Sequence, residues 1–575
     1  MSKKFISLLI IVAMLSVSII GCGNSSDTST DTSETVESTE EVTAESSADS
    51  SKLVVCLGTE PDYLDPALIT TVDAAALVSN AFVGLYTYDE NNEIIPAIAD
   101  GEPEVSEDGL TYTIKLKETC WSNGQPLTAE DFIYSWNRAI NPETGAGYEY
   151  IFNVIDGYDE GELNVTALDD YTLQIVLSNV CVYFDDLLAF PTFYPVYQAD
   201  VEAGDEPYSW ATEAGFVSNG AYAVTSWDHN NSITYEANSY FYNASEVTMP
   251  SVEFVLSADD ASIYERFNVG EIDFTTIFPT TEIRTLLSSP VLHNNNALSV
   301  YYVGFNVNSD IFSGLTVEQA DNMRKAMSLL IDRQYIVDTV GQMEQVTAGS
   351  FIPQGMSDGN GGVFNSGSAD SYYDASATGA SMMEEAMSLL KTCGYSFDYN
   401  GDNTYTISPA LSVDYLTNES SMHEAIAESI AQDLSVIGID VNIIVEDRNA
   451  FMDDRRNGNY DLAREGWSAD FNDPYDMLAI FETNSANNDM QFGRDSSNSS
   501  APDWTAYDNL MTEITTTTDT ALRAELMHEA LDMLMDTWAV VPLYYYNDVY
   551  LQNTSVSGIY STLSQNRYFM YATKE

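Results

Sequence analysis

Cys22 has the most distinctive chemical setting in the chain, because it follows the aliphatic and small residues of Ile19–Gly21. This order is typical of a lipobox, in which the thiol receives a diacylglyceryl group and cleavage leaves the cysteine as the mature N-terminus. Two lysines precede an apolar run of 16 residues, Phe5–Ile20, which is short for a membrane-spanning helix and suits a signal-peptide core. We therefore predict a lipoprotein signal peptide over 1–21 and lipidation at Cys22, with an ordinary secretory signal and an incidental cysteine as the alternative.

The segment that follows, from Gly23 to Ser51, has the composition of a flexible tether. It contains 15 Ser or Thr and eight Asp or Glu residues, and no Lys, Arg or aromatic residue, so it cannot build a hydrophobic core. We predict that 22–51 holds a globular body, which begins near Lys52, to the outer face of a bacterial cell membrane. No later apolar segment reaches 18 residues, so we do not expect the body itself to cross the membrane.

The remaining chemistry-bearing residues argue against several classes of function. With 20 Lys and Arg residues against 89 Asp and Glu residues, the formal net charge is −69, which would repel a nucleic-acid backbone. Four His and five scattered Cys residues argue against a metal site built from several histidines. We find no Walker loop, H-E-x-x-H or G-x-S-x-G motif, and carboxylates are too numerous to single out a catalytic pair. We therefore expect no enzyme activity, no cofactor and no metal, in a monomer.

Four cysteines follow the tether: Cys56, Cys120, Cys181 and Cys393. An even number in an exported protein permits disulfide bonds. These cysteines are far apart in the sequence and lie in apolar surroundings, so we favour buried free thiols and leave disulfides as the alternative.

Two periodicities alternate along the body and predict a mixed α/β fold. Alternation of apolar and polar residues predicts strands at Leu110–Lys117, Tyr171–Leu177, Ile439–Val445 and Tyr460–Glu465. Helical spacing predicts helices at Ala129–Ile140, Asn322–Val340, Met382–Leu390, Ser421–Val436 and Thr520–Met535. Thr128, with two acids after it, is a start signal for the first of these helices. The stretch rich in Gly and Ser from Gly355 to Gly379 predicts a long exposed loop.

Three blocks of sequence carry a more specific signal than any single motif. Residues 121–148 read WSNGQPLTAEDFIYSWNRAINPETGAGY, residues 217–227 read VSNGAYAVTSW, and residues 451–474 read FMDDRRNGNYDLAREGWSADFNDP. In content and in linear order, these blocks resemble the oligopeptide-binding proteins of ABC importers, within the wider cluster of peptide, nickel and sugar binders. The resemblance extends over nearly the whole body, from TEPDYLDPAL at Thr59 to the last pair of strands.

The resemblance implies a two-lobe periplasmic-binding-protein fold of the α/β class, with a hinge and an extra subdomain inserted in the first lobe. A ligand would lie enclosed between the lobes, and the closed form would dock on a membrane permease. The first lobe is then expected to comprise 52–82, 201–298 and the returning segment 538–575. The inserted subdomain is expected at 83–200 and the second lobe at 299–537.

Asp470 is the first site residue that the resemblance implies. In oligopeptide binders the matching Asp pairs with the free α-amino group of the peptide, and this is chemically sound because an enclosed ammonium needs a counter-charge. A solvated loop residue is the alternative. Trp467 would line a side-chain pocket or else pack in the core, and Ser468 is placed beside the ligand. Some relatives have Cys at the positions of Ser468 and Ser299, so that bridge is absent here.

The resemblance places five further residues near the ligand. Arg464 and Arg455 match family arginines beside the peptide, and arginine forms paired hydrogen bonds with carboxylates; a structural pair with a nearby Asp is the alternative. His423 matches a histidine that approaches the C-terminal end of the peptide, or else is structural. Tyr148, in the inserted subdomain, matches a contact residue, and Val72 completes the predicted binding set.

The chain departs from the family pattern at four positions near the ligand. An acid of the family falls at Thr70, a pocket Trp at Arg448, an Asn at Ile277, and a Lys that meets peptide C-termini at Gly341. Backbone hydrogen bonds to an extended peptide need no particular side chain, so we expect binding to survive. Preferences for peptide length and side chain are expected to differ.

We therefore expect an extracytoplasmic, lipid-anchored protein that captures oligopeptides and delivers them to an ABC permease, with no nucleic-acid partner. The first rival is the same fold with an oligosaccharide or another nutrient, favoured if aromatic platforms face the cleft and Asp470 pairs with no ligand. The second is a secreted glycosidase, which needs two carboxylates about 5–10 Å apart that flank one point. A receptor for peptide pheromones would carry the same sequence features as the importer component.

Overall fold

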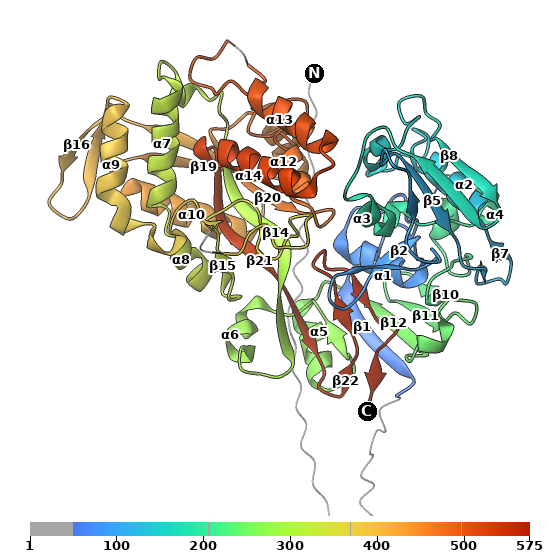
Figure 1. The fold of residues 1–575 in the computed structure, drawn as a ribbon. Helices are drawn as coiled ribbons and strands as arrows, with labels where there is room; N and C mark the ends of the chain where they lie inside the picture. Colours follow the sequence, from blue (N-terminus) through green and yellow to red (C-terminus); the bar gives the residue numbers. More distant parts are fainter. Residues whose placement is uncertain (1–49, 205–207, 368–369, 496) are drawn as a thin grey trace, which may run out of the picture. The chain divides into compact units, whose positions relative to one another are not determined.

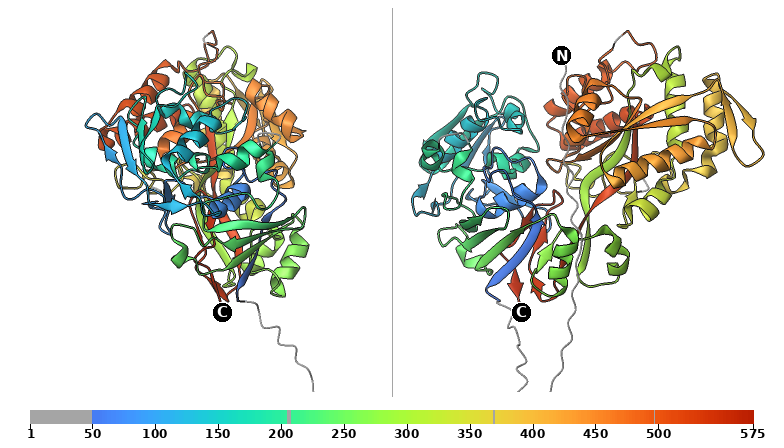
Figure 2. Two further views of the ribbon diagram at one scale, coloured as in Figure 1. Left: turned by 90° about the vertical axis from the view of Figure 1, so that its right-hand side faces the viewer. Right: turned by 180° about the vertical axis from the view of Figure 1, so that it is seen from behind.

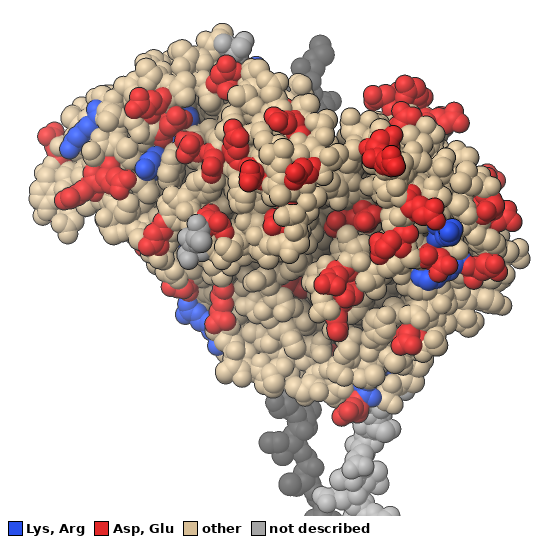
Figure 3. Space-filling view, viewed as in Figure 1, with Lys and Arg blue, Asp and Glu red and all other residues tan. Residues whose placement is uncertain are grey.

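The computed structural model describes residues 50–575, apart from 205–207, 368–369 and 496, and the described chain forms one compact unit. The predicted signal peptide, the lipidation site Cys22 and nearly all of the predicted tether lie outside the described residues. Among the helices of the described ranges, none combines the length and the hydropathy needed to cross a bilayer. On the face drawn in Figure 3, Asp and Glu side chains far outnumber Lys and Arg side chains.

One mixed sheet of 11 strands runs through the described chain (Figure 1). Its strands, in order, are β10 (Tyr222–Asp228), β11 (Ser232–Ala237), β12 (Ser251–Leu256), β1 (Lys52–Gly58), β13 (Phe274–Thr275), β21 (Val540–Gln552), β14 (Leu292–Phe305), β20 (Leu462–Ser468), β18 (Ser412–Asn418) and β19 (Asp440–Glu446), with β15 (Val346–Thr347) beside β21. The pairs β1–β12, β1–β13, β18–β19 and β18–β20 are parallel, and the other pairs are antiparallel. The predicted mixed α/β class is therefore confirmed.

The two longest strands, β14 and β21, connect the two ends of this sheet (Figure 1). β14 pairs with β21 along nearly its whole length, from Leu551 to Val540. The C-terminal end of β21 also pairs with β13 on its other side. The register of the β14–β21 pair shifts between Asn296 and Val300, and an irregularity of this kind bends and twists a strand pair. These two strands are the bridge between two large hydrophobic cores, around which we define a first and a second lobe.

The core of the first lobe extends through the segment 83–200 without interruption. This segment contains a four-stranded antiparallel sheet and a helix, formed by β4 (Glu104–Val105), β5 (Thr111–Lys115), β9 (Thr172–Val176), β8 (Val165–Asp169) and α2 (Ala129–Ala139). Trp121, Trp136 and Phe152 of the segment are fully buried. The predicted start of α2 is confirmed, because Thr128 and Asp131 form a reciprocal capping box in which the Thr128 backbone N–H donates to Asp131 at 2.7 Å.

Helices cover the sheet in the second lobe. They are α7 (Val317–Leu330), α9 (Met383–Thr392), α10 (Ser421–Ser435), α11 (Arg448–Asn457), α12 (Pro474–Ala479), α13 (Thr505–Thr516) and α14 (Thr520–Asp536). β18, α10 and β19 form a parallel crossover unit in which α10 packs along both strands (Figure 2). The predicted strands and helices of this lobe match β19, β20, α9, α10 and α14 within a few residues at each end.

The predicted single helix Asn322–Val340 is wrong, because the chain turns in its middle. α7 already begins at Val317 and ends at Leu330, and Ile331 is extended. Asp332 then starts a new helical segment, since its carboxylate accepts a hydrogen bond from the Tyr335 backbone N–H at 2.9 Å. An Asp side chain that bonds local backbone favours a helix start over a helix interior.

The stretch Gly355–Gly379 is mostly loop, but the prediction that it is exposed is wrong in part. Met356 and Phe364 are buried, and the Phe364 ring stacks on His528 with ring centres 3.8 Å apart. Among the four cysteines, which are all free thiols, burial is complete only for Cys56 and Cys181. Burial raises the pKa of the Cys56 thiol to about 11, which fits an unreactive core residue.

Candidate functional site

Two cavities, each of about 310 Å³, lie where residues of the two lobes meet. The first, which we name the Asp470 cavity, is lined by four of the predicted binding residues: Val72, Tyr148, Ser468 and Asp470. Other lining segments are 69–71 and 189–191 from the first lobe, 298–299 at the crossing strands, and 563–566 near the C-terminus. Residues that are far apart in the sequence are therefore brought together around one space.

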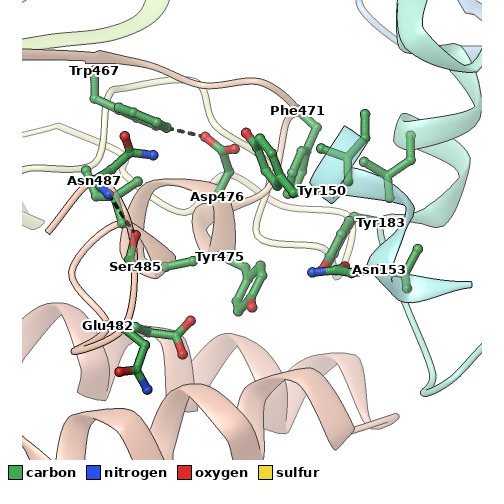
Figure 4. Close-up of a pocket in the computed structure, with 16 residues that line it drawn as sticks. Tyr150, Asn153, Tyr183, Trp467, Phe471, Tyr475, Asp476, Glu482, Ser485 and Asn487 are labelled. Carbon is green, nitrogen blue, oxygen red and sulfur yellow. Dashed lines mark hydrogen bonds between the residues drawn. The ribbon is translucent and has the colours of Figure 1, made fainter. Parts of the chain in front are cut away.

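The second space, which we name the Trp467 cavity, is drawn in Figure 4. Its lining side chains are five aromatic rings, two carboxylates, several amides and a few aliphatic groups, and they include Tyr150, Tyr183, Trp467, Phe471, Tyr475, Asp476, Glu482, Asn153, Asn484 and Asn487. The predicted residue Trp467 therefore lines a pocket and does not belong wholly to the core. Tyr150, Tyr183 and Phe471 belong to the core of the first lobe or pack beside it, Trp467 packs against the core of the second, and Tyr475 packs against both.

The loop that carries Asp470 is held firmly at both ends. It begins where β20 ends at Ser468 and finishes at Asp473, whose carboxylate accepts from the Tyr475 backbone N–H at 2.9 Å and so caps α12. The same carboxylate receives two hydrogen bonds from Arg523, at 2.7 and 2.9 Å. The paired Arg523 adds a buried ion pair that the sequence did not reveal.

Asp470 lies against a second carboxylate, that of Asp476. The Asp476 Oδ2 atom accepts from the Asp470 backbone N–H at 3.2 Å and from the Trp467 indole N–H at 3.0 Å. Asp470 in turn accepts from the Tyr150 hydroxyl at 3.1 Å. Neither carboxylate forms an ion pair with any cation of the described chain. The two acids therefore lie close together and accept hydrogen bonds, but no positive charge balances them.

The electrostatic state of this pair follows from its burial. Burial raises the pKa of Asp470 to about 6, although hydrogen bonds from Tyr150 and Tyr148 act in the opposite direction. Burial, together with the charge of Asp470, raises the pKa of Asp476 well above its usual range. A cation placed beside these carboxylates would stabilise their ionised forms. The site is therefore chemically suited to bind an ammonium or guanidinium group.

Tyr148, Tyr150 and Val72 bring the first lobe to this site. Tyr148 precedes the 3₁₀ turn Glu149–Val154, and its ring lies 6.1 Å from that of Tyr150. Val72 is the first residue of α1 (Val72–Ala81) and is 40 % exposed, so it offers an apolar contact at the cavity wall. Thr70, the position at which the resemblance implies an acid, also lines the cavity. Because Thr70 has no carboxylate, the carboxylate at the Asp470 cavity comes from the second lobe, from Asp470 itself.

Arg464 forms a second polar centre, on β20 among tyrosines. Its guanidinium carbon lies 5.6 Å from the ring centre of Tyr301, and its buried Nε finds no hydrogen-bond partner in the described chain. The Tyr301 hydroxyl lies 3.3 Å from Nδ1 of His423. Burial and the charge of Arg464 lower the pKa of His423 to about 4, so this histidine is neutral at pH 7. A buried guanidinium without a carboxylate partner is suited to bind an anionic group.

Arg455, the other predicted arginine, is placed differently. Its guanidinium contacts two carboxylates of the second lobe, Glu465 at 2.7 Å and Asp489 at 2.8 Å. All three side chains are largely buried, and none of them lines either cavity. The alternative of a structural pair, which the sequence left open, therefore describes the geometry of Arg455 better, although the acids are not the adjacent Asp residues.

Ser299 and Ser468 face each other across β14 and β20. The Ser299 hydroxyl donates to the Ser468 hydroxyl at 2.8 Å, at a position where the two residues are register partners. A hydrogen bond thus joins the two strands at the point where some relatives have a pair of Cys residues.

The two lobes also touch through aromatic rings beside the cavities. Tyr183, of the first lobe, stacks on Phe471 with ring centres 4.5 Å apart and on Tyr475 with centres 5.6 Å apart. Arg523 lies over the same Tyr183 ring, 5.6 Å from its centre. Phe471 is buried in the core of the first lobe although β20, which precedes it, belongs to the second. The loop after β20 therefore reaches from one lobe into the other.

Sequence reasoning missed Asp476 and Glu482, which both line the Trp467 cavity. Asp476 lies six residues after Asp470 and beyond Pro474, so only the turn into α12 brings the two carboxylates together. The one available signal was the helix start at Pro474, which predicts that the chain reverses direction there.

Comparisons with known proteins agree with this architecture. Residues 93–489 match the family described as bacterial extracellular solute-binding proteins, family 5 Middle. The chain is 29 % identical over 548 residues to the oligopeptide-binding protein OppA of Bacillus subtilis, with 90 % of this chain and 92 % of that protein covered. It is 30 % identical over 520 residues to the periplasmic oligopeptide-binding protein OppA of Escherichia coli, with 87 % and 88 % covered.

The solved structure of Haemophilus influenzae OppA in complex with RPPGFSPFR is also similar, with a TM-score of 0.71 and 26 % identity over 92 % of this chain and 99 % of that chain. This likeness confirms two lobes of mixed α/β structure. The family match spans the strand β20 and the loop with Asp470, so it includes the part of the chain where the carboxylate pair is built. The chain therefore belongs to family 5 of the bacterial extracellular solute-binding proteins.

Proposed function

We propose that the chain is an extracytoplasmic substrate-binding protein that captures oligopeptides between its two lobes and delivers them to the permease of an ABC importer. The observation that carries this proposal is the Asp470–Asp476 pair, a half-buried and a buried carboxylate that lack a counter-charge in the described chain. The free α-ammonium group of a peptide supplies that charge, because a buried acid is stabilised by a close cation. The relatives named oligopeptide-binding proteins support the choice of peptide.

The two polar centres give the peptide a direction. We assign the α-ammonium group to Asp470, and the negative or carbonyl groups farther along the peptide to Arg464, which lines neither cavity but has a buried Nε without a partner in the described chain, with neutral His423 as a hydrogen-bonding neighbour. Arg455 has a positioning role only, because its guanidinium is engaged by Glu465 and Asp489 inside the second lobe. It holds β20, and β20 holds Arg464 and the loop that leads to Asp470.

The other predicted residues form the walls around the amine. Val72, Tyr148 and Ser468 line the Asp470 cavity, and Trp467 lines the neighbouring one and fixes Asp476 through its indole N–H. The ligand is enclosed when the lobes close about the crossing strands β14 and β21. The chain acts as a monomer and catalyses no reaction, since capture and release alone serve the importer.

Attachment to the membrane rests on the sequence. The lipobox at Ile19–Cys22 and the following Ser-, Thr- and acid-rich segment support a diacylglyceryl anchor at Cys22 with a flexible tether. A tether of this kind keeps the binding protein close to its permease and leaves the lobes free to move.

A double-mutant cycle on the amine tests the function directly. One tetrapeptide is offered with a free and with an acetylated N-terminus, to the parent protein and to Asp470→Asn, and binding is measured by calorimetry. Asp470→Asn should weaken binding of the free peptide by about 2–5 kcal/mol, because one member of an enclosed charge pair is lost. Acetylation should cost a similar amount in the parent, and the two changes together should cost less than their sum.

Asp453→Asn is the matched control, because Asp453 is exposed on α11 and the charge change is the same. Asp473 is unsuitable, since its removal would strand Arg523. Equal affinity of Asp470→Asn and parent for the free peptide would overturn the amine site. A parent that binds an oligosaccharide and no peptide would leave the family membership intact and show that the ligand is wrong.

A further inference from the structure

The Trp467 cavity has an unusual combination of aromatic walls and acidic groups. Five rings surround the space, from Tyr150, Tyr183, Trp467, Phe471 and Tyr475. Its 16 lining residues include two carboxylates, on Asp476 and Glu482, and no Lys or Arg. Figure 4 shows Asp476 and Glu482 on opposite sides of the Tyr475 ring, so that the acids mark two levels of one space.

The position of the cavity ties it to the proposed amine site. Tyr150 lines the Trp467 cavity and also donates its hydroxyl to Asp470 at 3.1 Å. Asp476 lines the Trp467 cavity and accepts from the backbone N–H of Asp470. A peptide whose α-ammonium lies on Asp470 therefore has this cavity next to its first residue.

Both carboxylates of the cavity are free to take a further donor. Asp476 is only 7 % exposed, its Oδ2 atom receives both of its hydrogen bonds, and its Oδ1 atom receives none from the described chain. Glu482 has neither a hydrogen bond nor an ion pair to its carboxylate within the same residues. Burial and the like charge of Asp508 raise the pKa of Glu482 to about 7.

The nearest candidate for an internal counter-ion is already engaged. Arg523 lies over the Tyr183 ring, but its guanidinium makes two hydrogen bonds to Asp473. The carboxylates of the cavity thus lack a cation of their own. Electron-rich ring faces attract a cation further, and the long aliphatic stem of Lys or Arg packs well on apolar walls. A volume of about 310 Å³ lies at the lower end of the range for ligand sites, roughly 300–1,000 Å³, and suits one side chain.

We propose that the Trp467 cavity is a subsite for the first side chain of the peptide and that Glu482, with Asp476, selects Lys or Arg at that position. This inference rests on the proposed peptide-binding function. The cationic head lies at Glu482, with its stem against the rings of Tyr475 and Trp467, and Asp476 adds negative charge on the other side of the Tyr475 ring, next to Asp470. The first residue of a preferred peptide therefore carries two positive charges, its α-ammonium and its side chain.

Two pairs of peptides test the subsite by calorimetry at pH 7.5. The first pair is Lys-Ala-Ala-Ala and its analogue with norleucine in place of Lys, which keeps the stem and removes the charge. The second pair, Ala-Ala-Lys-Ala and its norleucine analogue, moves the same change away from the first position. The parent should favour Lys over norleucine by at least about tenfold in the first pair, the size expected for hydrogen bonds to a charged group. In the second pair the preference should be much smaller.

Glu482→Gln tests the assigned carboxylate with the same peptides. It should reduce the Lys-over-norleucine ratio of the first pair to below about threefold, because the charge is lost and the shape is kept. Glu513→Gln, an exposed change on α13, should leave the ratio as in the parent. Since the readout is a ratio within one protein sample, partial unfolding of a variant does not alter it.

The outcomes separate this inference from the proposed function. If the parent binds both peptides of the first pair equally, the subsite is wrong and peptide capture stands. If the parent binds none of the four peptides, the proposed function itself is overturned. A ratio that Glu482→Gln leaves unchanged would show that Glu482 does not select the side chain.

Discussion

Two buried acidic clusters lie along β20 and the loop that follows it, and they differ in how their charge is balanced. In the first, Glu465 and Asp489 share the guanidinium of Arg455. In the second, Asp470 and Asp476 receive hydrogen bonds from hydroxyl, indole and backbone groups, but no cation of the described chain reaches them. The first cluster is therefore neutralised by an arginine of the protein itself, and the second is not.

This difference separates a structural cluster from a binding site. A buried pair that carries its own counter-ion is complete in the free protein, and breaking it leaves an uncompensated charge. A buried pair without a counter-ion holds protons instead, and a ligand cation completes it. Each cluster contains an acid from the block 451–474, Glu465 in the first and Asp470 in the second, so the sequence alone does not tell them apart. The side chains that the fold places around each cluster distinguish the two.

We expect the largest effect from the loss of Arg455, which should lower the free energy of unfolding. Arg455→Met leaves Glu465 and Asp489 buried without their ion-pair partner, so the free energy of unfolding should fall by about 3–5 kcal/mol. Urea denaturation measures this change. Arg448→Met is the control, because Arg448 is exposed in the same helix, and it should change stability by less than about 0.5 kcal/mol. Equal stability of the two variants would mean that the first cluster is not structural.

A fall in pH should affect stability and binding in opposite directions. The pKa values of Asp470, at about 6, and of Asp186 and Glu482, at about 7, lie above those of an unfolded chain. Their favourable contribution to folding is therefore present at low pH and lost as the pH rises through 6 and 7. The melting temperature of the ligand-free protein should thus rise between pH 7 and pH 5.

Peptide affinity should fall over the same range. The groups that face Asp470 are Tyr148 and Tyr150 from the first lobe and Asp476 from α12, and none of them is a cation. Protonation of Asp470 removes the charge that pairs with the ammonium, so affinity should drop about tenfold at one pH unit below the pKa. Calorimetry at pH 7 and pH 5 measures it. Stability and affinity that fall together on acidification would contradict the assignment of this cluster as uncompensated.

The Tyr150 hydroxyl should have the smallest effect. Tyr150→Phe removes the hydrogen bond to Asp470, and peptide affinity should weaken by about 1 kcal/mol, or about fivefold. Because this bond lowers the pKa of Asp470, the midpoint of the affinity–pH curve should also move upward. Tyr158→Phe, which removes a hydroxyl that bonds Glu149, serves as control. An unchanged midpoint in Tyr150→Phe would show that the hydroxyl does not act on the carboxylate.

The sequence predicted the helices and strands whose periodicity is strong, and it predicted site residues where these lie in distinctive blocks. α10, α14 and the start of α2 were predicted from local spacing, and local contacts form them. The break after Leu330 was missed, because an apolar pattern continues through the turn while Asp332 starts a new segment. Burial of Phe364 in a loop depends on His528, which is distant in the sequence.

The residues of the candidate site likewise fall into those that the sequence predicted and those that it missed. Asp470, Tyr148, Val72 and Ser468 came from the resemblance, and the fold places them at one cavity. Their binding roles stay predictions. Asp476 and Glu482 were missed, because their importance depends on which cations are absent around them. An absent partner is a property of the folded chain, and no local pattern of residues encodes it.

The stacking of Tyr183 on Phe471 and Tyr475 has a thermodynamic consequence for the empty carrier. Each aromatic pair contributes about 0.5–1.5 kcal/mol beyond its buried area, so the joined arrangement of the lobes keeps part of its stability without a ligand. When only a fraction of molecules is competent to hold the ligand, the apparent dissociation constant is the intrinsic value divided by that fraction. These rings therefore favour the joined arrangement of the lobes in molecules that carry no ligand, and a ligand that needs that arrangement would meet more molecules already in it.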